Sequence, residues 1–250
     1  MRKFGLIGYP LGHSFSKKYF TEKFHNEHII NCSYENYPLT NIDQLHDLIN
    51  DEAELHGLNV TIPYKSEVIK LLDRVSPEAE EIGAVNVIKI TRPEGKVILS
   101  GYNSDVTGIR DSLVPFLEDY VKSALVLGTG GSSRAVCYFL KKAGIEFTLV
   151  SRYRKEGVIT YSDINPRILK DTYLIINTTP LGMLPDVSSK PDIDYSLLGS
   201  KHILFDLVYN PEETLFMKMG IQQGCSVING IKMLHSQAEK AWEIWNDNSL

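Results

Sequence analysis

The chain has 250 residues, of which 43% are apolar and 23% are charged, and its formal net charge at pH 7 is −5. These values are typical of a folded globular protein with one large domain or two smaller ones. The negative charge disfavours nucleic-acid binding, and no apolar run approaches the roughly 20 residues that a membrane span needs. The N-terminus lacks a signal-peptide pattern, so we expect a cytoplasmic protein with neither nucleic-acid nor membrane partners.

The cysteines and histidines do not form a ligand pattern. Cys32, Cys137 and Cys225 are odd in number, widely spaced and free of any Cys-x-x-Cys pair. They therefore predict neither a disulfide framework nor a zinc site. His25 and His28 are the only close pair of histidines, and we expect them to be structural or exposed to solvent. The sequence predicts no metal site.

Residues 4–8 form a short apolar run that predicts a buried strand, and a loop with Ser14 and Ser16 follows it. The next segment has helical spacing at Tyr19, Phe20 and Phe24. Either serine suits the N-cap of that helix. Two hydroxyl groups beside the N–H groups of a helix start also suit a carboxylate ligand. Without further support, capping is the preferred interpretation.

Further strands are expected at 32–37 and 57–61, with a helix at 42–49 between them. Pro63 ends the strand at 57–61, because proline cannot donate a ladder hydrogen bond. It suits the first turn of a following helix. The apolar positions of that helix are Val68, Ile69, Leu71 and Leu72.

Three polar residues, Asn59, Thr61 and Lys65, lie where this strand ends and the helix is expected to begin. Open α/β sheets bind ligands at the carboxyl ends of their strands. A lysine is slightly unfavourable near the positive end of a helix dipole. This favours a functional role for Lys65 over that of an ordinary solvated lysine.

Residues 83–90 predict a strand that forms a hairpin with residues 97–100. Asn103, Ser104 and Asp105 then lead into a segment with helical spacing. Ser104 or Asp105 can cap that helix, which is an adequate account of both residues on their own.

The apolar run 125–127 ends in a glycine-rich turn, Gly128-Thr129-Gly130-Gly131, that leads into a helix. We expect Gly144 to end this helix in a left-handed conformation, after two lysines that suit the negative end of the dipole. A second apolar run follows at 147–150. Strand, glycine turn, helix and strand are typical of a dinucleotide-binding unit, which holds the pyrophosphate at the helix N-terminus. An ordinary tight turn is the alternative, and the context decides between them.

The remaining chain predicts strands at 173–177, 203–209 and 226–228 and a short helix at 214–219. Gly230 opens the last helix, which carries an apolar stripe along one face. We expect this stripe to be core rather than a cofactor contact. Its members are Ile231, Leu234, Ala238, Trp242 and Trp245.

Taken together and in this order, the motifs resemble the shikimate dehydrogenase family over nearly the whole chain. The segments that carry the resemblance are Ser14–Ser16, Asn59–Lys65, Gly83–Asn86, Asn103–Asp105, Gly128–Gly131, Asn177–Met183, Asp206–Tyr209 and Gly230–Gln237. The resemblance implies an α/β fold of two domains with the active site in the cleft between them. Residues 1–104 plus 230–250 would form the substrate domain, and 105–229 a Rossmann-type NADP-binding domain. The expected assembly is a monomer or a homodimer.

The resemblance also implies roles for individual residues. Those that would contact the substrate are Ser14, Ser16, Asn59, Thr61, Asn86, Asp105, Tyr209 and Gln237. The two serines and Tyr209 would bind the carboxylate, and the others the ring hydroxyls, with Asn59 close by. Lys65 and Asp105 would form the catalytic pair, because reduction of a ketone builds negative charge on an oxygen that needs a cationic proton donor. The cofactor residues would be Gly128, Thr129, Gly130, Gly131, Ser132, Ser151, Arg152, Arg154, Thr178, Leu207 and Gly230.

One segment departs from the family pattern. The family usually carries Asn-Arg-Thr where this chain has Ser151-Arg152-Tyr153, followed by Arg154 and Lys155. Ser151 stands where NAD enzymes place an acidic residue for the ribose 2′-hydroxyl. The cations and the missing carboxylate favour a 2′-phosphate, and hence NADP as the cofactor.

The function that the resemblance implies is the NADP-dependent interconversion of 3-dehydroshikimate and shikimate, a step of chorismate and aromatic amino acid biosynthesis. One alternative is a quinate/shikimate dehydrogenase with broader substrate or NAD use, which the polarity around Ser14 would decide. The other is a non-catalytic binding module of the same fold. The presence of Lys65, Asp105 and the full glycine turn argues against that module.

Overall fold

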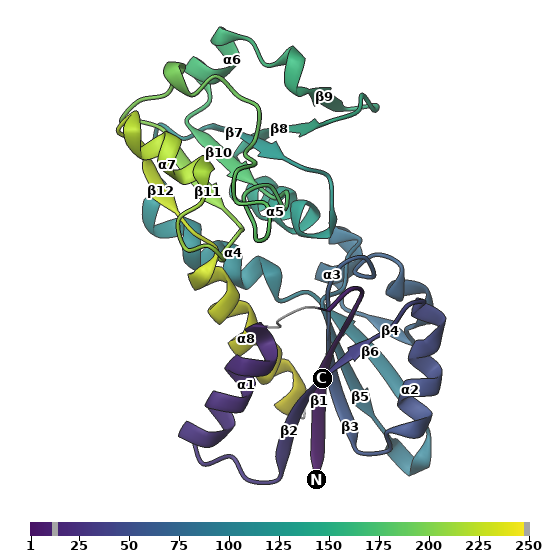
Figure 1. Ribbon diagram of the computed structural model, residues 1–250. Coiled ribbons are helices and arrows are strands. Elements are labelled where there is room, and N and C mark those ends of the chain that lie inside the picture. The colour runs from purple at the N-terminus through teal and green to yellow at the C-terminus, as the bar shows by residue number, and fades with distance from the viewer. Residues whose placement is uncertain (12–14, 248–250) are drawn as a thin grey trace. The chain divides into compact units, whose positions relative to one another are not determined.

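The structure, a computed structural model, describes residues 1–11 and 15–247. The chain forms two compact units, Met1–Ser104 with Ala238–Leu250 and Asp105–Gln237, which we call unit 1 and unit 2. Each unit is built around its own six-stranded sheet, with helices packed on it (Figure 1). The α/β class expected from the sequence is confirmed.

The last helix, α8 (Ile231–Asn246), begins in unit 2 and ends in unit 1. Its early turns pack on Gly108 of α4 (Asp105–Leu113). A Cβ at Gly108 would lie only 2.4 Å from the carbonyl oxygen of Met233. The boundary in the structure therefore falls at 237/238, whereas the sequence analysis placed it at 229/230.

The sheet of unit 1 is mixed, with the strand order β2-β1-β3-β5-β6-β4. β1 is parallel to β2 and β3, whereas β5 is antiparallel to β3 and β6. The strands are β1 (Arg2–Gly8), β2 (Cys32–Pro38), β3 (Leu55–Val60), β4 (Arg74–Val75), β5 (Val87–Thr91) and β6 (Ile98–Tyr102). The helices are α1 (Phe15–Asn26), α2 (Leu45–Asp51) and α3 (Pro77–Ile82), with the 3-10 helices η1 (Ile42–Gln44), η2 (Val68–Leu71) and η3 (Pro93–Gly95).

Alternate residues of β1 point to opposite faces of this sheet. Phe4 joins an aromatic cluster under α1 and α8, and Ile7 joins an aliphatic cluster on the face that α2 covers (Figure 1). The aromatic cluster consists of Phe4, Phe20, Phe24, Tyr34, Trp242 and Trp245. Burying one side chain of phenylalanine size stabilises a fold by about 1.5–3 kcal/mol. The aromatic part of the stripe on α8 is core, as predicted.

In unit 2 the strand order is β12-β11-β10-β7-β8-β9, and all neighbouring strands are parallel. Counted from β7, this is the 3-2-1-4-5-6 order of dinucleotide-binding folds. The strands are β7 (Ser123–Leu127), β8 (Glu146–Ser151), β9 (Val158–Thr160), β10 (Leu174–Asn177), β11 (Ile203–Asp206) and β12 (Ser226–Ile228). Besides α4 and α8, the helices are α5 (Gly131–Lys142), α6 (Pro166–Asp171) and α7 (Leu215–Gln222), with η4 (Val114–Phe116), η5 (Tyr161–Asp163) and η6 (Tyr195–Leu197).

The predicted strand–turn–helix–strand segment of unit 2 is confirmed. The central strands β7, β10 and β11 are buried along most of their length, as parallel strands covered on both faces are. Gly144 has a φ of +69° and follows the end of α5, so it is the left-handed cap that the sequence predicted.

The α-helix predicted to start near Pro63 is wrong. Residues 62–67 form turns, and the short 3-10 helix η2 follows them. The carbonyl of Lys65 accepts the N–H of Val85 at 2.7 Å, instead of the N–H of Ile69 that an α-helix would supply. The helix-dipole argument for Lys65 therefore no longer applies.

The strand predicted at 83–90 begins at Val87 instead. Gly83 has a φ of +69° and ends α3, a helix that the sequence analysis did not predict. Ser76 caps that helix by accepting the N–H of Ala79 at 3.2 Å. β9 and α6 were not predicted either, because each is too short to show a clear period.

Candidate active site

In unit 1, backbone hydrogen bonds between three loops bring Thr61, Lys65 and Asn86 together. The N–H of Thr61 donates to the carbonyl of Ile7 at 2.9 Å, which fixes the end of β3 beside the end of β1. The Asn86 carbonyl accepts the N–H of the last residue of β3 at 2.9 Å, and the Lys65 carbonyl accepts the N–H of Val85. Thr61 and Lys65 are half-buried, and Asn86 is buried.

The carboxamides of Asn59 and Asn86 are both buried and bonded within unit 1. Asn59 accepts the hydroxyl of Tyr34 at 2.7 Å and donates to the carbonyl of Asn86 at 3.4 Å. Asn86 donates to the hydroxyl of Ser104 at 3.0 Å and accepts the N–H of the same residue at 2.7 Å. These bonds tie β2, β3 and the start of β5 to the residue before α4. The first effect of both asparagines is thus to hold the loops of the candidate site.

Of the two serines predicted to bind a carboxylate, Ser14 lies outside the described residues. Ser16 lies in the first turn of α1, and its hydroxyl is hydrogen-bonded to that of Tyr34. Burial raises the pKa of Tyr34, and the bond with Ser16 offsets only part of that rise. The ring of Phe20 stacks on Tyr34 at 4.7 Å between centroids. Sequence reasoning missed Tyr34, for which the only signal was its place in an alternating strand.

The glycine turn of unit 2 meets the loop after β10. Gly128 has a φ of +118°, and a Cβ there would lie 2.4 Å from the hydroxyl oxygen of Thr178, so both backbone and space require glycine. Thr178 donates to the carbonyl of Leu127 at 2.8 Å, and Ser133 donates to that of Gly128 at 2.8 Å. A Cβ at Gly130 would meet open space. The turn therefore leaves room beside the N-terminus of α5. The turn residues assigned to the cofactor are Gly128, Thr129, Gly130, Gly131 and Ser132.

Ser151 is the last residue of β8, and the two arginines assigned to the cofactor follow it. The guanidinium of Arg154 pairs with Asp163 at 2.7 Å. The guanidinium of Arg152 lies 5.8 Å from the ring centroid of the exposed Tyr153. Among the residues that the structure describes, Arg152 is therefore the arginine of this pair without a carboxylate partner.

Leu207 and Gly230 meet at the carboxyl end of β11. The N–H of Leu207 donates to the carbonyl of Asn177 at 3.0 Å, which joins the ends of β10 and β11. A Cβ at Gly230 would lie 2.3 Å from the carbonyl oxygen of Leu207, so this close approach requires glycine. Tyr209, two residues after Leu207, is half-buried, and its burial raises the pKa of its hydroxyl.

Asp206, the last residue of β11, was not singled out by sequence reasoning. Its carboxylate is fully buried and accepts the side-chain amide of Asn177 at 3.0 Å, the N–H of Val208 at 3.0 Å and the hydroxyl of Thr214 at 2.5 Å. Burial raises the pKa of Asp206 to about 6, and the three bonds offset part of that effect. Asn177 in turn accepts the N–H and hydroxyl of Thr179. This network, which we call the Asp206 network, fixes the loops that carry Thr178, Leu207 and Tyr209.

Asp105 and Gln237 belong to unit 2, whereas Lys65 belongs to unit 1. Asp105 is buried and begins α4, and Gln237 is half-buried on α8. The residues assigned to one reaction therefore come from both units.

In the described part of the chain, no three histidine, cysteine, aspartate or glutamate side chains gather so that they could hold a metal ion. The three cysteines are free thiols. No helix within the described ranges is both long and apolar enough to cross a bilayer.

Comparisons with known proteins decide the family. Residues 6–88 match the model of the shikimate dehydrogenase substrate binding domain. The shikimate dehydrogenase (NADP(+)) of Methanococcus aeolicus is 37% identical over 264 residues, which cover 96% of this chain and 90% of that protein. The chain belongs to the shikimate dehydrogenase family.

Solved structures of shikimate dehydrogenases agree with this assignment. A chorismate mutase/shikimate 5-dehydrogenase fusion protein from Clostridium acetobutylicum is 36% identical, with a TM-score of 0.84 over 98% of this chain and 91% of that one. Shikimate 5-dehydrogenase from Thermus thermophilus, solved in complex with NADP(H) and shikimate, is 30% identical, with a TM-score of 0.84 over 98% and 94%. The two-unit architecture of this chain is thus that of the shikimate dehydrogenase family.

Proposed function

We propose that this chain catalyses the reversible NADPH-dependent reduction of 3-dehydroshikimate to shikimate. The observation that carries the proposal is the 37% identity, over 96% of the chain, to an enzyme named shikimate dehydrogenase (NADP(+)). In this proposal unit 2 binds the cofactor, and the substrate is bound by residues of unit 1 together with Asp105, Tyr209 and Gln237 of unit 2.

The residues of unit 2 fit NADP. Glycine is required at Gly128 and at Gly230, and a Cβ at Gly130 would face open space beside the start of α5. Helix N-termini with such turns bind pyrophosphate. Arg152, which is exposed directly after β8, suits a 2′-phosphate. Ser151 stands where NAD enzymes place an acidic residue, so no carboxylate at that position would repel the phosphate. Bound NADPH supplies the hydride that reduces the ketone carbon.

The protein's own part in the reaction is to place the substrate and to move a proton. Ser14, Ser16 and Tyr209 bind the carboxylate, and Thr61, Asn86, Asp105 and Gln237 bind the ring hydroxyls, with Asn59 holding the loops. As the ketone oxygen gains negative charge, the Lys65 ammonium stabilises it and donates the proton that completes the hydroxyl. Asp105 holds the neighbouring hydroxyl and orients the lysine. In the reverse direction Lys65 takes the proton back.

The proposal predicts that the absorbance at about 340 nm rises with time when the purified protein is given shikimate and NADP, because NADPH forms. We expect a clearly lower rate with NAD, and little or no rate with quinate, whose extra hydroxyl sits on the carbon that bears the carboxylate. Equal rates with quinate and shikimate would instead assign the broader quinate/shikimate activity. No turnover with either compound would leave a binding module of the same fold.

Arg152→Ala is expected to raise the KM for NADP at least tenfold and to leave that for NAD nearly unchanged. A charge-assisted bond to a phosphate is worth roughly 1.5–3 kcal/mol, which accounts for the size of the effect. Arg154→Ala is the comparison variant, and its effect should be smaller because Arg154 is paired with Asp163. Equal losses with both cofactors after Arg152→Ala would show that this arginine does not read the 2′-phosphate.

A further inference from the structure

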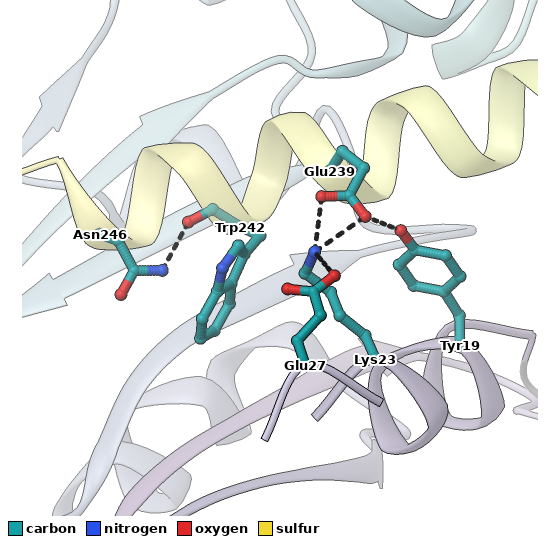
Figure 2. Close-up of polar contacts among 6 residues, drawn as sticks. All are labelled: Tyr19, Lys23, Glu27, Glu239, Trp242 and Asn246. Atoms are coloured by element: carbon teal, nitrogen blue, oxygen red, sulfur yellow. Dashed lines mark hydrogen bonds and ion pairs between the residues drawn. The ribbon is translucent and has the colours of Figure 1, made fainter. Parts of the chain in front are cut away.

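A group of charged residues links α1 to α8 within unit 1 (Figure 2). The ammonium of Lys23 on α1 lies 2.7 Å from Glu27 and 2.8 Å from Glu239 on α8. The hydroxyl of Tyr19, also on α1, donates to the same carboxylate of Glu239. Figure 2 shows Glu239 reaching from α8 toward both side chains of α1. We call these four residues the Glu239 cluster.

Lys23 is charged although its side chain is only 7% exposed, against 52% for Glu27 and 45% for Glu239. Burial by itself lowers the pKa of Lys23. The bonds to Glu239 and Glu27 together raise this pKa by more than burial lowers it, so the net pKa lies above its ordinary value. The pKa of Tyr19 is also raised, mainly by burial and secondly by the bond to Glu239. The cluster therefore holds a buried ammonium and a neutral phenol that donates.

Glu239 is the member of the cluster that joins the two helices. Lys23 lies on α1, and Glu27, four positions further on, directly follows that helix. The pair therefore stabilises α1 alone. Loss of charge at Glu239 would leave the buried ammonium with a single, more exposed partner, and removal of one partner from a buried pair is costly.

The cluster lies on the face of α1 that also carries Ser16. Positions three and seven residues apart share one face of a helix, so Ser16, Tyr19 and Lys23 line up. Ser16 is about 4.5 Å along the helix axis from Tyr19. Among the other contacts of α1, Phe20 and Phe24 pack into the aromatic cluster, Ser16 bonds to Tyr34, and Lys17 forms an exposed ion pair with Glu35 of β2 at 2.7 Å. Apolar burial is non-directional, whereas a buried ionic contact fixes register.

We propose that Glu239 is a positioning residue, which sets the rotation and height of α1 on α8 and thereby places Ser16 for the substrate carboxylate. The inference rests on the proposed function for the identity of the ligand at Ser16. It assigns the cluster a part in substrate affinity, in addition to any part in stability.

The test uses Glu239→Gln in the full chain, with Glu243→Gln as the matched control. Glu243 is on the same helix and pairs with Lys240 at 2.9 Å, but that pair is exposed. We expect Glu239→Gln to raise the KM for shikimate roughly five- to tenfold, with kcat within about twofold and the KM for NADP unchanged. Glu243→Gln should change none of these. Hydrogen exchange of the amides of residues 19–24 should accelerate in Glu239→Gln only.

Tyr19→Phe is the second variant, for the case that Glu239→Gln does not fold. It keeps the ring that stacks on Phe15 at 5.6 Å and removes only the donor to Glu239, so a smaller rise in the same KM is expected. A lower melting temperature with an unchanged KM for shikimate would overturn the inference and make the cluster purely structural. If the parent protein does not oxidise shikimate, the proposed function fails, while unchanged exchange of α1 in Glu239→Gln would separately overturn the positioning role.

Discussion

Replacing Lys65 with methionine is expected to lower kcat for shikimate oxidation by roughly 10²- to 10⁴-fold, the usual worth of a positioned acid–base group. Methionine keeps most of the bulk of the stem and removes the charge and the donor. The fold should survive, because Lys65 anchors its loop through its backbone carbonyl, which accepts the N–H of Val85. The KM for shikimate should change little, since the loss lies mainly in the transition state. Steady-state kinetics at saturating NADP measure both quantities.

Lys70→Met is the control, because Lys70 is exposed on η2 in the following turn and is assigned no role. Asp105→Asn should also slow turnover, and the double variant with Lys65→Met should lose less than the product of the two single losses, because the pair acts as a unit. If Lys65→Met turned over within a few-fold of the parent, Lys65 would be an ordinary surface lysine. The proton donor would then have to be sought at Asp105 or another group.

Asp206→Asn is expected to remove a pH dependence of stability that the parent shows. The pKa of Asp206 is about 6 in the folded protein, against 3.8 for the ordinary carboxyl. The folded state therefore binds a proton more tightly than the unfolded one, and stability is lost as the pH rises through this window. Between about pH 4.5 and 7.5 the parent should lose about 2 kcal/mol relative to the variant.

Asparagine suits this position because its side-chain oxygen can accept from Val208 and Asn177, as one carboxylate oxygen does now. Its amide group can donate to the hydroxyl oxygen of Thr214, but the Thr214 hydroxyl then loses its present acceptor, which adds a loss of stability that does not depend on pH. The free energy of unfolding, measured in urea across the pH range, tests the prediction, with Asp171→Asn as an exposed control. A difference between parent and variant that stays constant with pH would contradict the raised pKa. A carboxyl NMR titration of Asp206 near pH 4 would do the same.

The sheet of unit 2 could be predicted because its signals are local. Parallel strands covered on both faces read as continuous apolar runs, and the glycine turn and Gly144 mark the ends of α5 within a few residues. The order of the strands could not be read from these runs. The resemblance implied a Rossmann-type domain beside a substrate domain, and the strand order of each sheet was seen only in the structure.

The region around Lys65 was predicted less well, because its conformation depends on distant partners. Local spacing favoured a helix after Pro63, but the carbonyl of Lys65 bonds to Val85, which lies on another loop. Gly83 gave no sign that it ends a helix, since α3 is only a turn and a half long. Such hydrogen bonds between segments far apart in the sequence leave no local pattern.

The candidate site shows the same division between residue type and surroundings. The motifs identified Asn59 and Arg154, but not that Asn59 accepts the hydroxyl of Tyr34 or that Arg154 pairs with Asp163. Asp206 stood inside a quoted motif and was still passed over, because its importance comes from burial and from Thr214, eight positions further along the chain. The sequence shows which functional groups are present. Whether a charged side chain is paired or buried by other segments is known only from the fold.

The split composition of unit 1 bears on how the protein is made. A ribosome extends the chain from its N-terminus, at about 5–20 residues per second, and domains generally fold as units. The segment 238–247 is made after the whole of unit 2, yet it supplies Trp245 to unit 1. Trp245 stacks on Phe4 at 4.8 Å and donates its indole N–H to the carbonyl of Ile88 at 3.0 Å. During synthesis, the apolar side chains on this face of the sheet are therefore not covered by Trp245 until all residues of unit 2 have been made. Unit 2 is continuous in sequence, so all of its strands are synthesised before residues 238–247. The nascent chain can therefore complete the fold of unit 2 before that of unit 1.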